Sequence, residues 1–292
     1  MLKGSIVALV TPFKNNDIDY NAVDRLISFH LENKTDGILI NGTTGESPSL
    51  ASDEKEYYFR YVIQKVNGRV PIMIGTGTNN LARTIIDTTK AKQLGADSAL
   101  VITPYYNKPT QEGLYQHYCA LSQVSPLPII LYNVPGRTGV NMRAETTLRL
   151  ARECANIVAV KEASGDLSQI KAIIDKAPEG FYLISGDDAI TTDVIALGGI
   201  GVISVFANAF PGEMVWLVRN ALEGNIAGAR RKMNADFEEL FHLMFVEGNP
   251  AGVKCLLSLR GMIHNRLRLP LVPVSAKIGQ LIKEELAKFV AV

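Results

Sequence analysis

The segment Ile157–Asp166 reads IVAVKEASGD and places a lysine at the end of a short apolar run. Four consecutive apolar residues predict a buried β-strand of the kind found in parallel sheets that are covered on both faces. Lys161 closes that strand. Burial disfavours the charged form of an amine, and a neutral lysine amine is a nucleophile that forms Schiff bases with carbonyl compounds. The alternative is a strand-end lysine that extends its ammonium group into solvent.

The same order, an apolar run followed by a helix-forming segment, recurs along the chain. The predicted strands cover residues 5–10, 37–40, 71–74, 99–102, 128–132, 157–161, 182–185 and 201–205. Helices are expected after each strand, and we expect Ser52 to cap the second helix and Asp166 or Ser164 the sixth. Eight strand–helix units predict an α/β fold, a (β/α)8 TIM barrel. A doubly wound open sheet is the alternative, and it is weaker because nothing interrupts the alternation.

The alternation of strands and helices stops near residue 225. We therefore divide the chain into a catalytic barrel over residues 1–224 and a C-terminal helical region over residues 225–292. Helices are expected in this second part over 227–246, 250–264 and 276–290. No low-complexity linker separates the two parts, so the helical appendage is expected to pack on the barrel.

The composition excludes several classes of protein. The 292 residues are 47% hydrophobic and 20% charged, as in ordinary globular proteins. A net charge of +1 argues against a surface for nucleic acid or anionic membrane. The three cysteines are separated in sequence and odd in number, which favours free thiols in a reducing compartment. We read the uncharged stretch 194–212 as a helix end, a glycine turn and a strand, and expect a cytoplasmic protein.

Polar residues at the predicted strand ends are the candidates for chemistry, because TIM barrels place their active sites there. Residues 41–47, NGTTGES, can present backbone amides to an anion such as a carboxylate, or can form a plain turn. Tyr132 is expected to point toward the barrel mouth, where its hydroxyl can move protons. Arg137 follows on a Pro-Gly loop and can grip a carboxylate through two hydrogen bonds, or can be an ordinary surface arginine.

Other strand ends favour structural roles. The segment 75–80, GTGTNN, lacks the third glycine of a dinucleotide-binding fingerprint. The loop 103–109, TPYYNKP, reads as a packing loop or subunit contact. Asp187 and Asp188 precede a predicted helix, so helix capping is favoured over metal binding. The four histidines show no ligand spacing, and we expect no metal and no organic cofactor.

Five motifs in order resemble the 4-hydroxy-tetrahydrodipicolinate (dihydrodipicolinate) synthase family of pyruvate-dependent class I aldolase-like barrels. The resemblance runs from about Gly4 to Pro273. The motifs are GTTGES at 42–47, TPYYNKP at 103–109, YNVPGRTG at 132–139, VKEA at 160–163 and SGDD at 185–188. Each motif alone is moderately specific, whereas all five at the right strand ends are highly specific.

The resemblance implies four catalytic residues. Lys161 resembles the Schiff-base lysine, and Tyr132 the proton donor and acceptor near the substrate. Thr43 resembles the relay between Tyr132 and Tyr106. In this family Tyr106 reaches in from a neighbouring subunit, which implies a homo-oligomer, a dimer of dimers that shares Tyr106 across its tight dimer.

The resemblance also implies the binding residues and the substrates. The amides of Thr43 and Thr44 would hold the carboxylate of pyruvate, and Arg137 would hold that of L-aspartate 4-semialdehyde. Ile203 would line the pyruvate site through its main chain, and Gly186 would leave space beside it. The implied reaction condenses these substrates in diaminopimelate and lysine biosynthesis, with no cofactor.

Two alternatives to this function remain open. A sister lyase for N-acetylneuraminate or keto-deoxy-sugar acids would share Lys161 and Tyr132 but would lack the arginine of the sequence Gly136-Arg137-Thr138. A non-catalytic barrel acting as scaffold or sensor would not need these side chains.

Several positions depart from the family pattern. Ser164 and Phe206 stand where threonine is usual, and Phe206 is expected to make the pocket wall more apolar. Many family members are inhibited by lysine at a cleft between subunits. Ser47, Asn79 and Tyr105 match that cleft, but Ser52 and Lys55 replace two histidines and Arg83 replaces a glutamate. The added positive charge predicts weak or absent inhibition by lysine.

Overall fold

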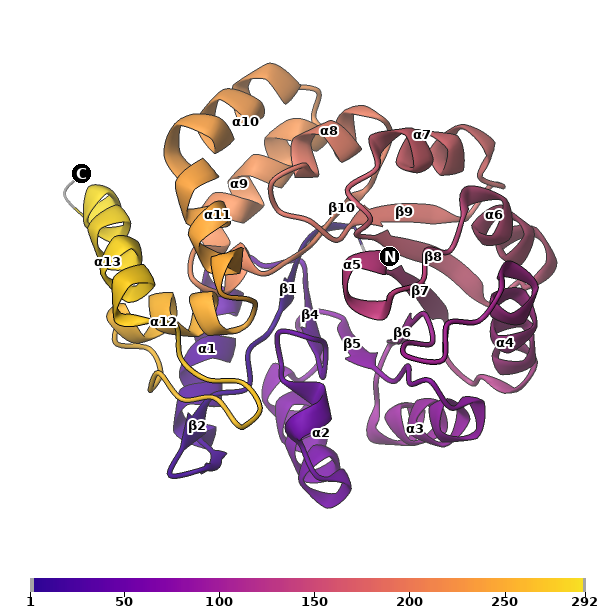
Figure 1. Cartoon of the computed structure of the whole chain (residues 1–292), viewed down its shortest axis with the longest axis horizontal. Helices are drawn as coiled ribbons and strands as arrows, with labels where there is room; N and C mark the ends of the chain where they lie inside the picture. Colours follow the sequence, from indigo (N-terminus) through magenta and orange to yellow (C-terminus); the bar gives the residue numbers. More distant parts are fainter. Residues whose placement is uncertain (1–2, 291–292) are drawn as a thin grey trace.

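Eight parallel strands form a closed barrel in the computed structural model, which describes residues 3–290 (Figure 1). Around the barrel the strands are β1 (Gly4–Ala8), β10 (Gly201–Ser204), β9 (Tyr182–Ser185), β8 (Ile157–Glu162), β7 (Ile129–Asn133), β6 (Ser98–Ile102), β5 (Ile72–Gly75) and β4 (Gly37–Ile40). β4 pairs with β1, so the sheet has no edge. The predicted TIM barrel is confirmed, and each of its strands lies within two residues of its expected start.

The helices that connect the strands surround the barrel (Figure 1). They are α1 (Tyr20–Glu32), α2 (Ser52–Val66), α3 (Leu81–Leu94), α4 (Gln111–Val124), α6 (Ala144–Glu153), α7 (Leu167–Lys176), α8 (Thr191–Ala196) and α9 (Pro211–Leu222). Asp166 caps α7 as predicted, because its carboxylate accepts from the amides of Ser168 and Gln169 at 2.9 and 3.1 Å. The prediction that Ser52 caps α2 is wrong.

The start of α2 shows why. Ala51, not Ser52, is the capping residue, with an extended backbone. Its amide donates to the Glu54 side chain at 3.3 Å, so a carboxylate inside the first turn satisfies a backbone donor at the helix start.

The loops of the barrel contain several short elements that the sequence pattern did not indicate. They are the antiparallel pair β2 (Phe13–Lys14) and β3 (Asp17–Ile18), the 3-10 turns η1 (Ser47–Ser49) and η2 (Phe206–Asn208), and the short helix α5 (Pro135–Thr138). The last of these matters for the site, because the segment carrying Arg137 is a helical turn where a loop was expected.

The C-terminal region is helical, as predicted, and packs beside α9 and α1 on one side of the barrel (Figure 1). It contains α10 (Ile226–Lys232), the π-helical turn η3 (Met233–Phe237), α11 (Glu238–Val246), α12 (Ala251–Leu259) and α13 (Ala276–Val290). The single helix expected over 227–246 is thus interrupted by a π turn, and α12 ends five residues before the predicted end at residue 264. The division of the chain at residue 224 falls between α9 and α10 and stays a prediction.

The barrel strands are buried on both faces. Ile130, Tyr132, Ala159 and Ile184 belong to an apolar cluster inside the barrel. Their neighbours along the strands belong to a second cluster between the barrel and its helices. This alternation fixes which side chains of each strand can reach the barrel mouth.

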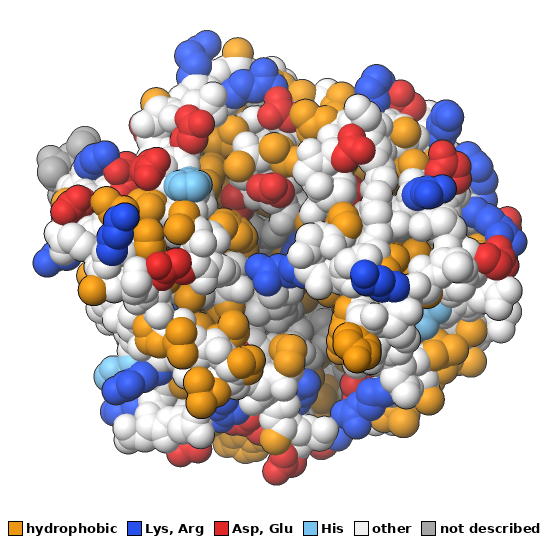
Figure 2. Space-filling model, in the orientation of Figure 1, with side chains coloured by type: hydrophobic (Ala, Val, Ile, Leu, Met, Phe, Trp, Pro, Cys, Tyr) orange, Lys and Arg blue, Asp and Glu red, His pale blue; other side chains and the backbone are white. Residues whose placement is uncertain are grey.

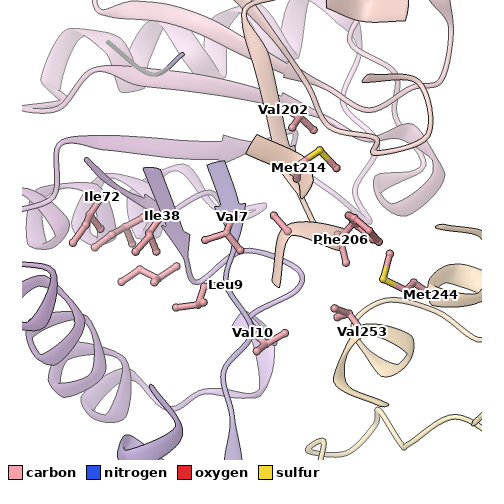
Figure 3. Packing of buried hydrophobic residues seen from close by; sticks show 14 of the residues in the cluster. Val7, Leu9, Val10, Ile38, Ile72, Val202, Phe206, Met214, Met244 and Val253 are labelled. Carbon is pink, nitrogen blue, oxygen red and sulfur yellow. The ribbon is translucent and has the colours of Figure 1, made fainter. Parts of the chain in front are cut away.

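Phe206 lies in this outer layer, so the expectation that it makes the pocket wall more apolar is wrong. Its ring centroid is 4.9 Å from that of Phe210, 4.8 Å from that of Phe237 and 4.9 Å from that of Phe241. Figure 3 shows Phe206 near Met214, Met244 and Val253, between the barrel and the C-terminal helices. The aromatic ring therefore joins the two parts of the chain instead of facing a substrate.

The three cysteines were expected to be free thiols. All three cysteines are free, although the Sγ atoms of Cys119 and Cys154 approach to 3.0 Å across α4 and the end of α6.

The uncharged stretch 194–212 contains the end of α8, a glycine turn and β10, as predicted. No helix within residues 3–290 combines the length and the apolar character that a membrane crossing needs.

Candidate functional site

A cavity of about 470 Å³ opens at the carboxyl ends of the barrel strands. Figure 2 shows charged side chains of both signs around the hollowed middle of one face of the molecule. The cavity is lined by Ala8, Leu39, Gly42, Thr43, Thr44, Leu100, Tyr132, Val134, Gly136, Arg137, Lys161, Ala163, Ser164, Gly186, Asp187, Val205, Phe245 and Asn249. Six of the eight predicted site residues are in this set: Lys161, Tyr132, Thr43, Thr44, Arg137 and Gly186.

Lys161 and Tyr132 face each other across neighbouring strands. They are directly paired in the parallel register of β7 and β8, and both are buried. The Lys161 Nζ atom lies 4.4 Å from the centroid of the Tyr132 ring. The alternative of a strand-end lysine extended into solvent is therefore wrong: the amine lies at a cavity beside the aromatic ring of Tyr132.

The next residues of the same two strands point to the opposite side of the sheet. The side-chain amide of Asn133 donates to both carboxylate oxygens of Glu162, at 3.0 and 3.1 Å. The backbone amide of Ser164 donates to the same carboxylate at 2.9 Å. Burial raises the pKa of the Glu162 carboxyl, and these hydrogen bonds oppose the rise. Strand β8 continues one residue beyond Lys161, so Glu162 is a strand residue and not part of the following loop.

The segment that follows β4 is folded into two successive turns. The amide of Gly45 donates to the carbonyl of Gly42, and that of Glu46 to the carbonyl of Thr43, both at 3.1 Å. Thr43 and Thr44, at the centre of these turns, line the cavity. The Thr44 hydroxyl accepts a hydrogen bond of 3.0 Å from the Asn249 side chain, which comes from the segment between α11 and α12.

Arg137 brings a cation to the cavity from α5. Its guanidinium donates to the carbonyl of Asn249 at 3.5 Å. The same asparagine thus contacts Thr44 through its side chain and Arg137 through its backbone. Asn249 was not singled out from the sequence, and only its place before Pro250 could have marked it as part of a special turn.

Gly186 leaves the space that the lysine occupies. A β-carbon at this position would lie 3.1 Å from Cε of Lys161 and 2.6 Å from Cβ of Ala163. Any side chain here would push against the lysine. A glycine is therefore required here for steric reasons, and the prediction that it leaves space beside a bound pyruvate stays a prediction.

The remaining two predicted residues lie elsewhere. Ile203 is buried in the apolar cluster inside the barrel. Tyr106 is 89% exposed in the single chain, with a left-handed backbone at φ 74°. Neither side chain lines the cavity.

Asp188 has a different role from the helix cap that was expected. Its Oδ2 atom accepts from the amides of Val205 and Phe206, both at 3.0 Å, so it ties the end of β10 to the segment after β9. The N-cap of α8 is Ile190, which makes no side-chain capping bond. Burial raises the pKa of Asp188 to about 6, although its hydrogen bonds from Ser204, Phe206 and Val205 oppose the rise. The capping prediction fails because the carboxylate turns inward to the strand end.

The residues that depart from the lysine cleft of the family lie around a smaller cavity of about 30 Å³. Arg83 does not extend freely into solvent: Nε pairs with Asp87 at 2.9 Å and a terminal nitrogen donates to the Ser52 hydroxyl at 3.1 Å. Burial lowers the pKa of Lys55, while Asp87 opposes this effect. Asp87 therefore neutralises part of the positive charge on which the expected insensitivity to lysine depends, and that insensitivity stays a prediction.

Potential metal ligands are scattered in the part of the chain that the structure describes. No three His, Cys, Asp or Glu side chains within residues 3–290 are grouped to hold a metal ion. The cavity instead brings together the amine of Lys161, the phenol of Tyr132, the Thr43–Thr44 turns and the guanidinium of Arg137. This set is suited to a substrate with a carbonyl group and carboxylates.

The model of the Dihydrodipicolinate synthetase family matches residues 1–289. The chain belongs to this family. A relative from Phocaeicola vulgatus named 4-hydroxy-tetrahydrodipicolinate synthase is 53% identical over 274 residues, which cover 93% of this chain and 92% of the relative. The crystal structure of dihydrodipicolinate synthase from Aquifex aeolicus is similar, with a TM-score of 0.96 and 43% identity over 99% of this chain and 98% of that chain.

A third comparison is to the dihydrodipicolinate synthase of Acinetobacter baumannii, solved in complex with pyruvate. It covers all of both chains, with a TM-score of 0.96 and 41% identity. The shared family, names and barrel give this member of the dihydrodipicolinate synthetase family the function of a 4-hydroxy-tetrahydrodipicolinate synthase. It is an enzyme of the lyase type, a class I aldolase-like synthase.

The raised pKa of Asp188 predicts a pH-dependent stability. Between about pH 4 and 6 the folded protein keeps a proton on Asp188 that the unfolded chain releases, so the free energy of unfolding falls as the pH rises through this window. The fall should be about 3 kcal/mol, since one unit of pKa corresponds to about 1.4 kcal/mol. The side chain of the Asp188→Asn variant cannot titrate, so this variant should lack the fall in the free energy of unfolding. Urea unfolding of the wild type and of Asp188→Asn from pH 4 to 7 measures the difference between their free energies of unfolding, with the surface variant Asp175→Asn as control. A difference that stays constant with pH would contradict the prediction.

Proposed function

We propose that Lys161 forms the Schiff base with pyruvate in this cavity. The observation that carries the proposal is the buried Lys161 amine, beside the Tyr132 ring and in the same cavity as the Thr43–Thr44 turns. The pyruvate complex of the Acinetobacter baumannii relative supports the choice of ketone. The amides of Thr43 and Thr44 would hold the pyruvate carboxylate, and the main chain of Ile203 would line its site.

The chemistry uses the imine as electron sink. Lys161 attacks the ketone carbon of pyruvate, and water leaves. The resulting iminium acidifies the adjacent methyl group, whose proton is lost to give an enamine. The enamine carbon adds to the aldehyde carbon of L-aspartate 4-semialdehyde. The amino group of that substrate then attacks the imine carbon, closes the ring and releases Lys161. Tyr132, in a relay with Thr43 and Tyr106, would move the protons.

Arg137 supports the assignment of the second substrate. It is a cation on the cavity wall, suited to the carboxylate of L-aspartate 4-semialdehyde. A sugar-acid lyase of the same superfamily, the second candidate, would need hydroxyl-binding groups at this place. A scaffold or sensor would gain nothing from a cavity that gathers Lys161, Tyr132 and a space-leaving Gly186.

The exposure of Tyr106 supports a shared site. The tyrosine is 89% exposed in one chain and does not line that chain's own cavity, so its ring is available to a neighbouring subunit. We infer a homo-oligomer, a dimer of dimers with Tyr106 crossing the tight dimer, that works in the cytoplasm.

Reductive trapping tests Lys161. Incubation with pyruvate and borohydride should reduce the imine and add the mass of the reduced pyruvate adduct to the peptide containing Lys161, as measured by mass spectrometry. Lys161→Ala and the charge-preserving Lys161→Arg should lose trapping and turnover, because neither supplies a primary amine. Lys254, the second buried lysine, should stay unmodified. Trapping at another lysine, or full turnover by Lys161→Ala, would refute the assignment.

The selection of the second substrate is tested by Arg137→Ala. Pyruvate adduct formation should stay nearly intact, while the KM for the aldehyde rises by roughly 10- to 100-fold, the loss expected for a hydrogen bond to a charged group. Initial rates at saturating pyruvate measure this KM. Arg143→Ala, an exposed arginine outside the cavity, is the control. An unchanged aldehyde dependence would remove Arg137 from the site, and activity with sugar acids instead would favour the sister lyase.

Mixing two inactive variants tests the shared site. Lys161→Ala chains supply an intact Tyr106, and Tyr106→Phe chains supply an intact Lys161, so a mixed dimer contains one complete site. Activity should therefore reappear after subunit exchange. Mixing each variant with itself is the control. If exchange is shown by mass spectrometry of differently tagged chains and no activity returns, Tyr106 does not complete a neighbour's site.

A further inference from the structure

A buried ion pair joins the loop after β4 to the C-terminal region. Lys254, on α12, and Glu46, at the end of the Thr43–Thr44 turns, form this pair, and both side chains are fully shielded from solvent. The Lys254 ammonium also donates to the carbonyl of Arg266 at 2.9 Å and lies 4.3 Å from the centroid of the Phe13 ring. The second oxygen of Glu46 accepts from the amide of Arg268 at 3.0 Å.

Such a pair is costly for stability alone. Removing two charges from water costs free energy that their attraction often does not recover, so buried pairs are weak evidence for stabilisation. Burial lowers the pKa of Lys254 to about 8, even though Glu46 favours the charged form. The local backbone is also constrained, since Glu46 adopts the left-handed conformation at φ 54°, which a residue other than glycine keeps only when its surroundings enforce it.

The position of Glu46 indicates what the buried ion pair does for the loop after β4. Its amide closes the turn on the carbonyl of Thr43 at 3.1 Å, and Thr44 is held two residues earlier by Asn249 at 3.0 Å. Both contacts from the C-terminal region therefore reach the turns that line the cavity, one through a charged pair and one through a neutral hydrogen bond. Arg268 extends the same connection to α2, where its guanidinium binds both oxygens of Glu54 at 2.6 Å.

We propose that Glu46 and Lys254 are positioning residues that hold the Thr43–Thr44 turns in the geometry required to bind the pyruvate carboxylate. The C-terminal region is then part of the machinery for substrate binding although α12 supplies no group to the cavity. The inference rests on the carboxylate-binding role proposed for these turns. It applies to the geometry of the loop, which can be measured without any turnover.

The experiment compares Lys254→Met, Glu46→Gln and the double variant. Each single variant leaves one buried charge without its partner and should lower the melting temperature. The double variant buries no unpaired charge, so its melting temperature should return toward the wild-type value. If the pair positions the loop, the pyruvate KM should nevertheless stay about tenfold or more above that of the wild type in all three variants, since small displacements of a binding group can change rates by up to about 100-fold.

Hydrogen exchange of peptides covering residues 42–46 supplies the readout that does not depend on activity, and exchange there should be faster in all three variants. Lys232→Met, which breaks a half-exposed ion pair elsewhere in the C-terminal region, is the matched control and should change neither the pyruvate KM nor the exchange of residues 42–46. If the double variant recovers pyruvate KM and loop exchange together with its melting temperature, the pair is merely structural and the proposal is overturned. Unchanged KM and exchange in the folded single variants would overturn it as well.

The two proposals fail in distinguishable ways. Borohydride trapping at saturating pyruvate should still label Lys161 in all three variants, because the amine itself is untouched. Absence of trapping in the wild-type enzyme would refute the Schiff-base mechanism, whereas the exchange rates of residues 42–46 would still decide whether the ion pair holds the loop.

Discussion

The register between β7 and β8 is the constraint on which the site depends. Parallel pairing places Tyr132 opposite Lys161 and Asn133 opposite Glu162. Because side chains alternate across a sheet, the first pair faces the inside of the barrel and the second faces the surrounding helices. A shift of one residue would exchange the two pairs and put a carboxylate where the amine must be. The hydrogen bonds from Asn133 to both oxygens of Glu162 oppose such a shift, so a polar contact outside the barrel fixes the chemical contact inside it.

Glu162 shows what this arrangement requires. Its carboxylate is buried without a cation among its hydrogen-bonding partners, which are the side chains of Asn133 and Gln169 and the amide of Ser164. Neutral donors can hold a buried carboxylate, but burial still raises its pKa. A cation would be a stronger partner.

Most of the fold and the centre of the candidate site could be predicted from the sequence, because both depend on patterns of neighbouring residues. Short apolar runs marked the eight strands, the last residues of two of them marked Tyr132 and Lys161, and the segments that follow strand ends marked Thr43 and Arg137. Apart from the cap of α2, the errors concern side chains whose partners are distant in sequence. Asp188 looked like a helix cap and instead binds the amides at residues 205 and 206, and Phe206 looked like pocket wall and packs against the C-terminal helices. No local spacing contains this information.

The same reasoning explains why the contribution of the C-terminal region was invisible in the sequence. Glu46 and Lys254 are separated by 208 positions, and Thr44 and Asn249 by 205. Each residue alone reads as an ordinary polar residue near a turn or helix start. A barrel supplies rigid strand ends, but the loops that follow them lie at the surface and depend on contacts with segments outside the sheet. Strands β7 and β8 place Tyr132 and Lys161 through backbone pairing, whereas the turns after β4 lie beyond the sheet and depend on contacts outside it. A hydrophobic contact could hold such a loop close, but it is not directional. A charged pair with two further backbone hydrogen bonds defines one orientation, which is what the amides of Thr43 and Thr44 would need in order to hold a carboxylate as proposed.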